Sequence, residues 1–202
     1  GESLKDLEIK DLTPKEKDFW YVKAPAFSFS KLKGMDTYLS PEMKSTGEAI
    51  GYDKKIHRAM YKAFIASGVN MHNYGTIIVT LANEDKLEAL PLIKRFYEMG
   101  FNIEATSGTA NFLKSNGIKT RIRKKISEGS EEILESIRAG YVSYVINTRS
   151  IASKTHSTDG ALIRRCAIEN NVTVFSSLDT VKVLLDVLEE TTICISTINN
   201  PK

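Results

Sequence analysis

From residue 75 onward, short apolar runs alternate with amphipathic segments, and this alternation constrains the fold more than any other feature of the sequence. The runs are rich in β-branched residues, which is typical of buried strands, and the segments between them have a helical spacing of apolar residues. Strands that alternate with helices form a parallel sheet whose two faces are both covered by helices. The sequence therefore predicts an α/β fold with a three-layer, doubly wound parallel sheet.

The positions of the elements follow from these runs and from the residues that start and end helices. A first helix is expected to be capped by Asn83 and ended by Gly100. Further helices are expected at 109–115, 130–139, 158–170 and 178–189. Strands are expected at 76–81, 101–105, 118–122, 142–147, 172–175 and 192–196.

Residues 1–74 lack this regular pattern, so a boundary is expected between residues 74 and 75. Two short extended pieces, 21–24 and 26–29, are separated by Pro25, and a helix capped by Asp53 should end at Ser67 and the glycine after it. We expect residues 1–74 to be an N-terminal α+β appendage, the tail of something larger, and residues 75–202 to be the α/β domain. The start at a glycine without a methionine fits an excised piece.

Charge and cysteine content narrow the function classes. A net charge of +3 without a Lys/Arg-rich run gives no reason to expect nucleic acid as a partner. No apolar stretch approaches the roughly 20 residues of a membrane span, so no membrane partner is expected either. Cys166 and Cys194 lie among apolar residues and are expected to be reduced core thiols, as in a cytoplasmic protein. His57, His72 and His156 have no metal-ligand spacing with these cysteines, so no metal site is expected.

Polar residues follow four of the predicted strands, at the edge where parallel sheets bind ligands. They are Thr80, Asn83 and Lys86, then Thr106, Ser107, Gly108 and Thr109, then Lys124 and Lys125, and finally Asn147, Thr148 and Arg149. Ammonium groups, hydroxyls and backbone N–H groups are suited to binding phosphate.

Each of these features also has a simpler explanation. Lys86 would lie in the first turn of a helix, where the helix dipole disfavours a cation by about 0.3–1 kcal/mol, but Glu84 and Asp85 could offset it in solvent. The hydroxyl-rich loop at 106–109 could be a plain turn with a threonine cap, and Lys125 could belong to a solvated basic face. Only their expected convergence at one edge favours a phosphate site.

Several motifs resemble the C-terminal, methylglyoxal-synthase-like domain of carbamoyl phosphate synthase large subunits. They lie at 106–109, 127–129, 145–148 and 163–165. Upstream, residues 27–29 and 39–48 are similar to the last stretch of the second ATP-grasp synthetase domain of that subunit. The resemblance implies that residues 1–74 are the tail of the synthetase domain with a linker helix, and that residues 75–202 are the methylglyoxal-synthase-like allosteric domain.

The resemblance also implies a function. The chain would be the regulatory, effector-binding region of a glutamine-dependent, cytoplasmic ligase of pyrimidine and arginine biosynthesis. It would bind a phosphorylated ribonucleotide such as UMP or IMP. The effector positions that it implies are Thr80, Lys86, Thr106, Thr109, Lys125, Asn147, Thr148, Asp159 and Ser177, with Arg149 as an extra contact where a threonine is usual. It gives no support for an ornithine response, because Ala24 stands at an expected acidic position and Val174 stands where an aromatic residue is expected.

No catalytic residue, cofactor or metal is expected in the chain itself. The parent ligase would use ATP with Mg or Mn, and its partners would be the rest of the large subunit and a glutaminase small subunit. Carbamoyl phosphate synthesis by this chain alone is therefore not expected. Without the synthetase domain, apolar residues of the appendage such as Trp20 and Phe27 could also support self-association.

Two other functions have to be weighed. A methylglyoxal-synthase-like lyase would bind dihydroxyacetone phosphate, and the spacing of His156 and Asp159 resembles a pair found in that enzyme. Its carboxylate base, however, aligns with Ser130, which cannot remove a carbon-bound proton without an activating partner. Glu131 is one residue away and would point elsewhere on a helix. The second alternative is a scaffold module whose site has degenerated.

Overall fold

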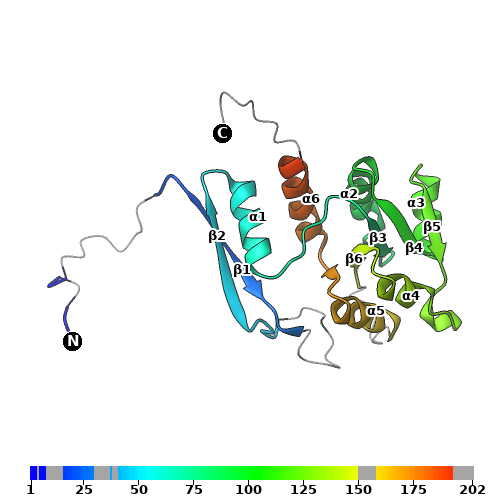
Figure 1. The fold of residues 1–202 in the computed structure, drawn as a ribbon, viewed down its shortest axis with the longest axis horizontal. Coiled ribbons are helices and arrows are strands. Elements are labelled where there is room, and N and C mark those ends of the chain that lie inside the picture. The colour runs from blue at the N-terminus through cyan, green and yellow to red at the C-terminus, as the bar shows by residue number, and fades with distance from the viewer. Residues whose placement is uncertain (4, 8–15, 30–36, 38–40, 150–157, 193–202) are drawn as a thin grey trace.

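The computed structural model describes residues 1–3, 5–7, 16–29, 37, 41–149 and 158–192. An N-terminal part contains strands β1 (Trp20–Ala26) and β2 (Gly47–Asp53) and helix α1 (Ile56–Ala66), followed by an alternating α/β part (Figure 1). The strands of the α/β part are β3 (Thr76–Thr80), β4 (Asn102–Thr106), β5 (Thr120–Arg123), β6 (Val142–Asn147) and β7 (Thr173–Phe175). Its helices are α2 (Lys86–Glu98), α3 (Ser107–Ser115), the 3₁₀ helix η2 (Ile126–Glu128), α4 (Glu132–Arg138), α5 (Thr158–Glu169) and α6 (Leu178–Thr192).

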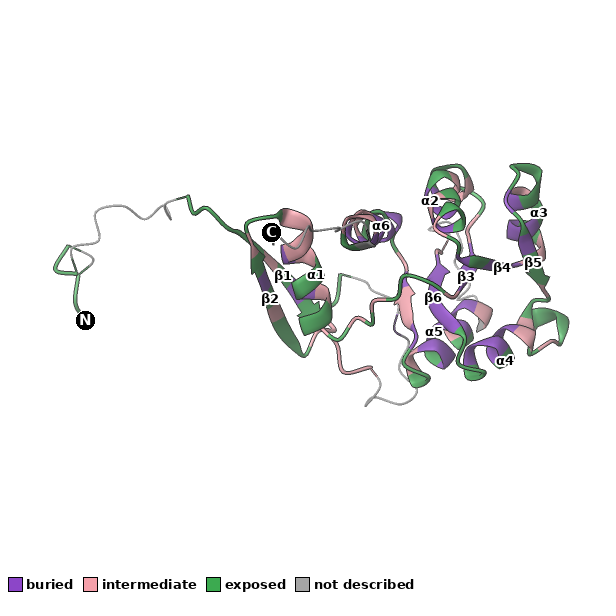
Figure 2. Ribbon diagram, turned by 45° about the horizontal axis from the view of Figure 1, so that its top comes forward, coloured by how far each residue is buried: buried purple, intermediate pink, exposed green. Residues whose placement is uncertain are grey.

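The five strands of the α/β part form one sheet in the order β5-β4-β3-β6-β7, and every neighbouring pair is parallel. All five residues of the central strand β3 are buried, as is typical of a sheet covered on both faces. Helices α2, α3 and α6 lie on one face and α4 and α5 on the other (Figure 2). The predicted three-layer α/β fold is confirmed.

Alternation along β3 divides the core between the two faces. Ile77 and Val79 pack with residues of α2, α3 and α6, including Phe96, in the larger apolar cluster. Ile78 points to the opposite face and packs with residues of α4 and α5, including Ile133. The order of strands reverses between β3 and β6, so the topological switch point of the sheet lies there. Open α/β sheets bind ligands in the crevice at this point.

The N-terminal part packs against α6 through its helix. Strands β1 and β2 pair antiparallel, and α1 lies between this two-stranded sheet and α6 (Figure 1). His57 of α1 is hydrogen-bonded to Glu190 of α6. Gly51 allows the close contact between β2 and α1, because a Cβ there would lie 2.1 Å from the Ala59 carbonyl oxygen.

Hydrogen bonds join the segment between α1 and β3 to the α/β part. The Tyr144 hydroxyl, on β6, donates to the His72 carbonyl at 2.8 Å and accepts from the His72 N–H at 2.5 Å. Asn70 donates from its side chain to the carbonyl of Asn171 at 3.0 Å. Just before β3, Gly75 has φ +123°, and a Cβ at this position would lie 2.0 Å from the Ser143 hydroxyl oxygen. Because of the positive φ and the contact with Ser143, glycine is favoured at this position just before β3.

Several expected elements differ in detail. Helix α2 begins at Lys86 and not after an Asn83 cap, because Ala82–Asp85 first form a turn closed by a hydrogen bond from Asp85 N–H to the Ala82 carbonyl. Strand β1 continues through Pro25, which is tolerated because β1 has a partner on one side only. Strand β2 had not been expected. Thr192, where a last strand was expected to begin, is the last residue of α6. The rest of that expected strand, 193–196, lies outside the described residues.

In the described parts of the chain, no helix is long and apolar enough to cross a membrane.

Candidate functional site

The carboxyl ends of β3 and β6 meet at the switch point, where two of the expected site residues contact each other. Thr80 and Asn147 are opposite each other in the strand register and both are buried. The Asn147 side-chain N–H donates to the Thr80 hydroxyl oxygen at 2.6 Å. Thr148 joins them, since its N–H donates to the Thr80 carbonyl at 3.1 Å and its hydroxyl accepts from the Ala82 N–H at 2.9 Å. The loop after β3 is therefore held by residues at the end of β6.

The end of β4 and the first turn of α3 border the same loop. Thr106 ends β4 and Thr109 lies in the first turn of α3. The Thr109 side chain is buried, and its hydroxyl accepts from the Leu81 N–H at 3.3 Å. From α2, the Lys86 ammonium reaches across and donates to the Gly108 carbonyl at 3.1 Å. Thr106, Thr109 and Lys86 are thus brought together with Thr80 at one edge of the sheet. We call this edge the strand-end site.

Electrostatics make the position of Lys86 unusual. It is the first residue of α2, near the positive end of that helix, and its ammonium also lies over the first turn of α3. A cation at a helix N-terminus costs about 0.3–1 kcal/mol. The first turn of α3 contains no acidic residue, and Thr106 makes no side-chain cap hydrogen bond. An anion bound here would be attracted by the ammonium and by the N–H groups of the first turn.

The remaining expected residues lie further out. Lys125 is exposed at the start of η2, and Asp159, in the first turn of α5, accepts from the Ser127 N–H at 3.0 Å. These two segments are therefore joined, and they flank the strand-end site from β5 and α5. Arg149 is half-buried directly after Thr148. Ser177 is exposed before α6, and among the described residues no hydrogen bond joins it to Thr80 or Lys86.

In the lyase alternative, Ser130 stands at the position that the resemblance assigns to the base. Ser130 lies just before α4, and its hydroxyl accepts from the Glu132 N–H at 3.3 Å. Glu131 is exposed and pairs with Arg138 at 3.0 Å on the outside of the same helix. His156 lies outside the described residues. Among the described residues, no group of three or more His, Cys, Asp or Glu side chains could hold a metal ion.

One residue of the site was not predicted from the sequence. Arg164 of α5 is only 4% exposed, and its guanidinium donates to the Asn147 side-chain oxygen at 2.6 Å. Gly160, one turn earlier, leaves room for this contact, since a Cβ there would lie 3.2 Å from the guanidinium and 3.4 Å from the Asn147 oxygen. The motif at 163–165 contained the arginine, but nothing in that motif indicates that it is buried.

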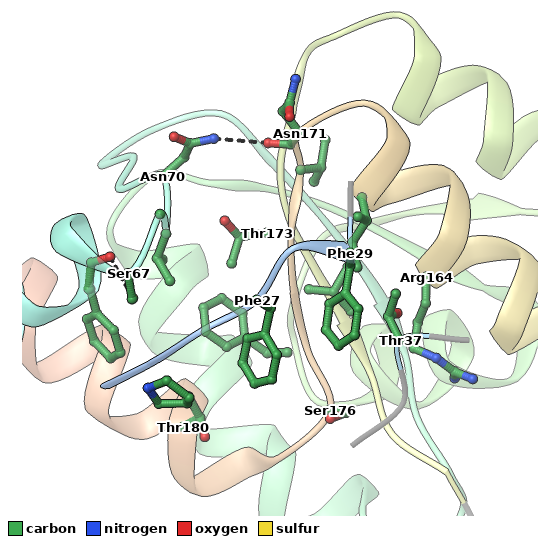
Figure 3. A pocket seen from close by; sticks show the side chains of 18 of the residues that line it. Phe27, Phe29, Thr37, Ser67, Asn70, Arg164, Asn171, Thr173, Ser176 and Thr180 are labelled. Atoms are coloured by element: carbon green, nitrogen blue, oxygen red, sulfur yellow. Dashed lines mark hydrogen bonds between the residues drawn. The ribbon is translucent and has the colours of Figure 1, made fainter. Parts of the chain in front are cut away.

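A separate cavity of about 390 Å³ lies between the N-terminal part and β7 (Figure 3). Phe27 and Phe29, whose rings stack with 4.9 Å between centroids, line one side, and Ala24 and Val174 also contribute. None of its described lining residues is acidic, and Arg164 is the one charged residue among them. A cationic amine such as ornithine would find no carboxylate in this lining.

Comparison with known proteins identifies the α/β part. Residues 88–176 match the family of MGS-like domains, so the chain contains an MGS-like domain, the domain type named after methylglyoxal synthase. Among solved structures, methylglyoxal synthase from Elizabethkingia anophelis NUHP1 is similar, with a TM-score of 0.49 and 16% identity over 57% of this chain and 79% of that chain. ForH is similar with a TM-score of 0.44 and 17% identity over 59% of this chain and 81% of that chain.

Proposed function

We propose that the MGS-like domain of this chain is a regulatory module that binds a phosphorylated ribonucleotide, of the UMP or IMP type, at the strand-end site. The observation that carries the proposal is the position of Lys86. Lys86 is the first residue of α2, and its ammonium extends to the first turn of α3, where it donates to the Gly108 carbonyl. Helix N-termini disfavour a cation, and in α2 the acidic Glu88 only partly offsets this cost. A bound phosphate would convert this unfavourable position into a charge-assisted contact.

Each group at the site has a role in this proposal. The phosphate would contact Lys86, Thr106, Thr109 and the N–H groups of the first turn of α3. Thr80, Asn147 and Thr148 lie at the switch point and would supply hydroxyl and amide groups to the rest of the ligand. One carboxylate oxygen of Asp159 accepts from Ser127, which leaves the other to accept from a ribose hydroxyl.

The parent protein that we propose is the large subunit of a carbamoyl phosphate synthase. The motifs at 106–109, 127–129, 145–148 and 163–165 support it, together with the upstream similarity at 27–29 and 39–48. In this assignment, the partners are the rest of the large subunit and a glutaminase subunit, in the cytoplasm. ATP and its Mg or Mn ions would act in the parent enzyme and not at the strand-end site.

A lyase remains the alternative for an MGS-like domain. A methylglyoxal-forming enzyme needs a base near the triose phosphate, and general-base catalysis contributes about 10²–10⁴-fold to a rate. Ser130 is not a carboxylate, and its hydroxyl accepts from the Glu132 N–H at the start of α4. Glu131 is exposed and forms an ion pair with Arg138, so it does not replace such a base. We therefore favour binding over catalysis.

Calorimetric titration of the protein with UMP, IMP, UTP and phosphoribosyl pyrophosphate tests the proposal. We expect at least one of these ligands to bind, and Lys86→Ala to weaken its binding by about 1.5–3 kcal/mol, the value of a hydrogen bond to a charged group. The control is Lys94→Ala, which removes an exposed lysine from the same helix and should leave affinity unchanged. Unchanged affinity in Lys86→Ala would show that the phosphate lies elsewhere. Methylglyoxal formation from dihydroxyacetone phosphate by the unmodified protein would favour the lyase.

A further inference from the structure

We infer that Arg164 is a positioning residue of the strand-end site: it fixes the Asn147 side-chain amide, which donates to Thr80 and leaves the Thr80 hydroxyl hydrogen for the ligand. The inference rests on the proposed function, because it concerns how that site recognises an oxygen acceptor. Arg164 is not among the site residues that the sequence predicts. It also lines the cavity between the N-terminal part and β7, which we call the junction cavity (Figure 3).

The contact with Arg164 fixes the orientation of the Asn147 side-chain amide. A guanidinium can only donate hydrogen bonds, so the atom of Asn147 that Arg164 contacts at 2.6 Å must be the acceptor oxygen. This removes the usual ambiguity between the oxygen and the nitrogen of an asparagine side chain. The nitrogen of Asn147 then necessarily faces Thr80, at 2.6 Å from its hydroxyl oxygen.

The contact with Asn147 then determines the hydrogen-bonding role of the Thr80 hydroxyl. Because the amide nitrogen can only donate, the Thr80 oxygen accepts this bond, and the Thr80 hydrogen is directed to another group. Thr80 lies at the end of β3, one residue before the loop that Thr109 and Thr148 hold. One of the two acceptor lone pairs of Thr80 is therefore used by Asn147, and its hydrogen is left for an acceptor such as a phosphate, carbonyl or ribose oxygen of a ligand at this edge.

Burial and close packing hold these three side chains in place. Arg164, Asn147 and Thr80 are all at least nine-tenths buried. Gly160 lies against both Arg164 and Asn147, with room for no larger residue unless these neighbours shift. The amide therefore has little freedom to turn over, and the donor character of Thr80 is fixed before a ligand arrives.

A double-mutant cycle tests this chain of contacts with UMP and IMP as probes. Thr80→Val removes the hydroxyl and keeps the shape, and Arg164→Met removes the guanidinium. We expect each single variant to weaken binding roughly tenfold, the effect of one hydrogen bond to a ligand. In the Thr80→Val background, Arg164→Met should cause little further loss, because Arg164 acts through Thr80. Arg164→Lys keeps a donor-only cation and should restore affinity to within about threefold of the wild type.

Two further measurements separate positioning from a loss of folding. The Asn147 side-chain NH₂ signals in ¹H–¹⁵N spectra should move in Arg164→Met and return in Arg164→Lys. If Arg164→Met does not fold, Asn147→Asp replaces it: a carboxylate held by Arg164 would accept from Thr80, so the hydroxyl would no longer donate to the ligand. The loss of affinity in Asn147→Asp should then be smaller when Thr80 is already valine.

The outcomes distinguish this inference from the proposed function. Wild-type binding that Lys86→Ala weakens but Arg164→Met leaves unchanged would refute the role of Arg164 and keep the effector site. Additive losses from Thr80→Val and Arg164→Met would refute it as well, since the two residues would then act independently. Binding of neither UMP nor IMP by the wild type would overturn both proposals.

Discussion

Tyr144 shows how a single hydroxyl joins the linker to the sheet. The ring is fully buried among Phe96, Phe101 and Phe175, while its hydroxyl makes two hydrogen bonds to the backbone of His72. Burial disfavours the phenolate and raises the pKa of Tyr144 from 10.0 to about 12. The neutral hydroxyl is therefore part of what keeps residues 67–75 against the α/β part.

This pKa predicts a loss of stability in alkaline solution. Because the folded pKa lies above the unfolded one, the contribution of Tyr144 is complete below pH 10 and is lost as the pH rises toward 12. The difference in free energy of unfolding between wild type and Tyr144→Phe should shrink by about 2 kcal/mol between pH 9 and pH 11.5, measured by urea denaturation. A constant difference for Tyr144→Phe would contradict the account.

At the residue scale, the sequence predicts which polar groups meet, but not how they are held. Thr80, Thr109 and Asn147 could be placed together because the carboxyl ends of parallel strands share one edge. Arg164 could not be placed, since an arginine beside apolar residues of an amphipathic helix usually faces solvent. Glu104 is a similar case: it is 3% exposed on β4, and its two carboxylate oxygens accept from Arg123 at 2.8 and 2.9 Å. Only the register of β4 with β5 brings these two residues together.

At the scale of elements, helices and buried strands are easier to predict than the N-terminal sheet. Strands β3 and β6 coincide with continuous, mainly apolar runs of the sequence, so the local pattern and the burial of the strands both favour the same structure. Strand β2 reads Gly-Glu-Ala-Ile-Gly-Tyr-Asp, in which glycines interrupt a weak alternation. Gly51 is needed because α1 approaches β2 closely at this point. This tertiary contact could not be predicted from the residues of the strand alone.

Gly51→Ala should therefore loosen the N-terminal part without affecting the strand-end site. The added Cβ would lie 2.1 Å from the Ala59 carbonyl oxygen and 2.4 Å from the Ala63 nitrogen, both in the backbone of α1. Overpacking of this kind costs about 1–3 kcal/mol. Hydrogen exchange should become faster in 20–26 and 47–66 and remain unchanged in 76–80 and 102–106.

The matched control for this prediction is Gly47→Ala in the same strand. A Cβ at Gly47 would meet only the Ala26 side chain, at 3.8 Å, which is an ordinary contact. Exchange rates in the N-terminal part should stay at wild-type values in this variant. Equal effects of the two substitutions would mean that the approach of α1 to β2 is not what Gly51 provides.

At the scale of the whole molecule, the division between residues 74 and 75 stays a prediction. The contacts between the two parts indicate how strongly the N-terminal part is held. The N-terminal sheet exposes Tyr21, Ile50 and Tyr52 on the face away from α1. Its attachment to the α/β part depends on a few contacts, including His57 with Glu190 and Asn70 with Asn171. Elements held by few contacts open more readily than a buried core, so lower protection is expected there.

Mapping the amide shifts of the intact protein on addition of UMP or IMP tests the central claim most directly. We expect the ¹H–¹⁵N signals of residues 80–86, 106–109 and 147–148 to move together as one saturable site, with smaller changes near 125–127 and 159. Signals around the junction cavity, such as those of 67–70 and 173–176, should move little. Saturable changes at the cavity alone, or no saturable change with either nucleotide, would contradict a nucleotide site at the strand ends.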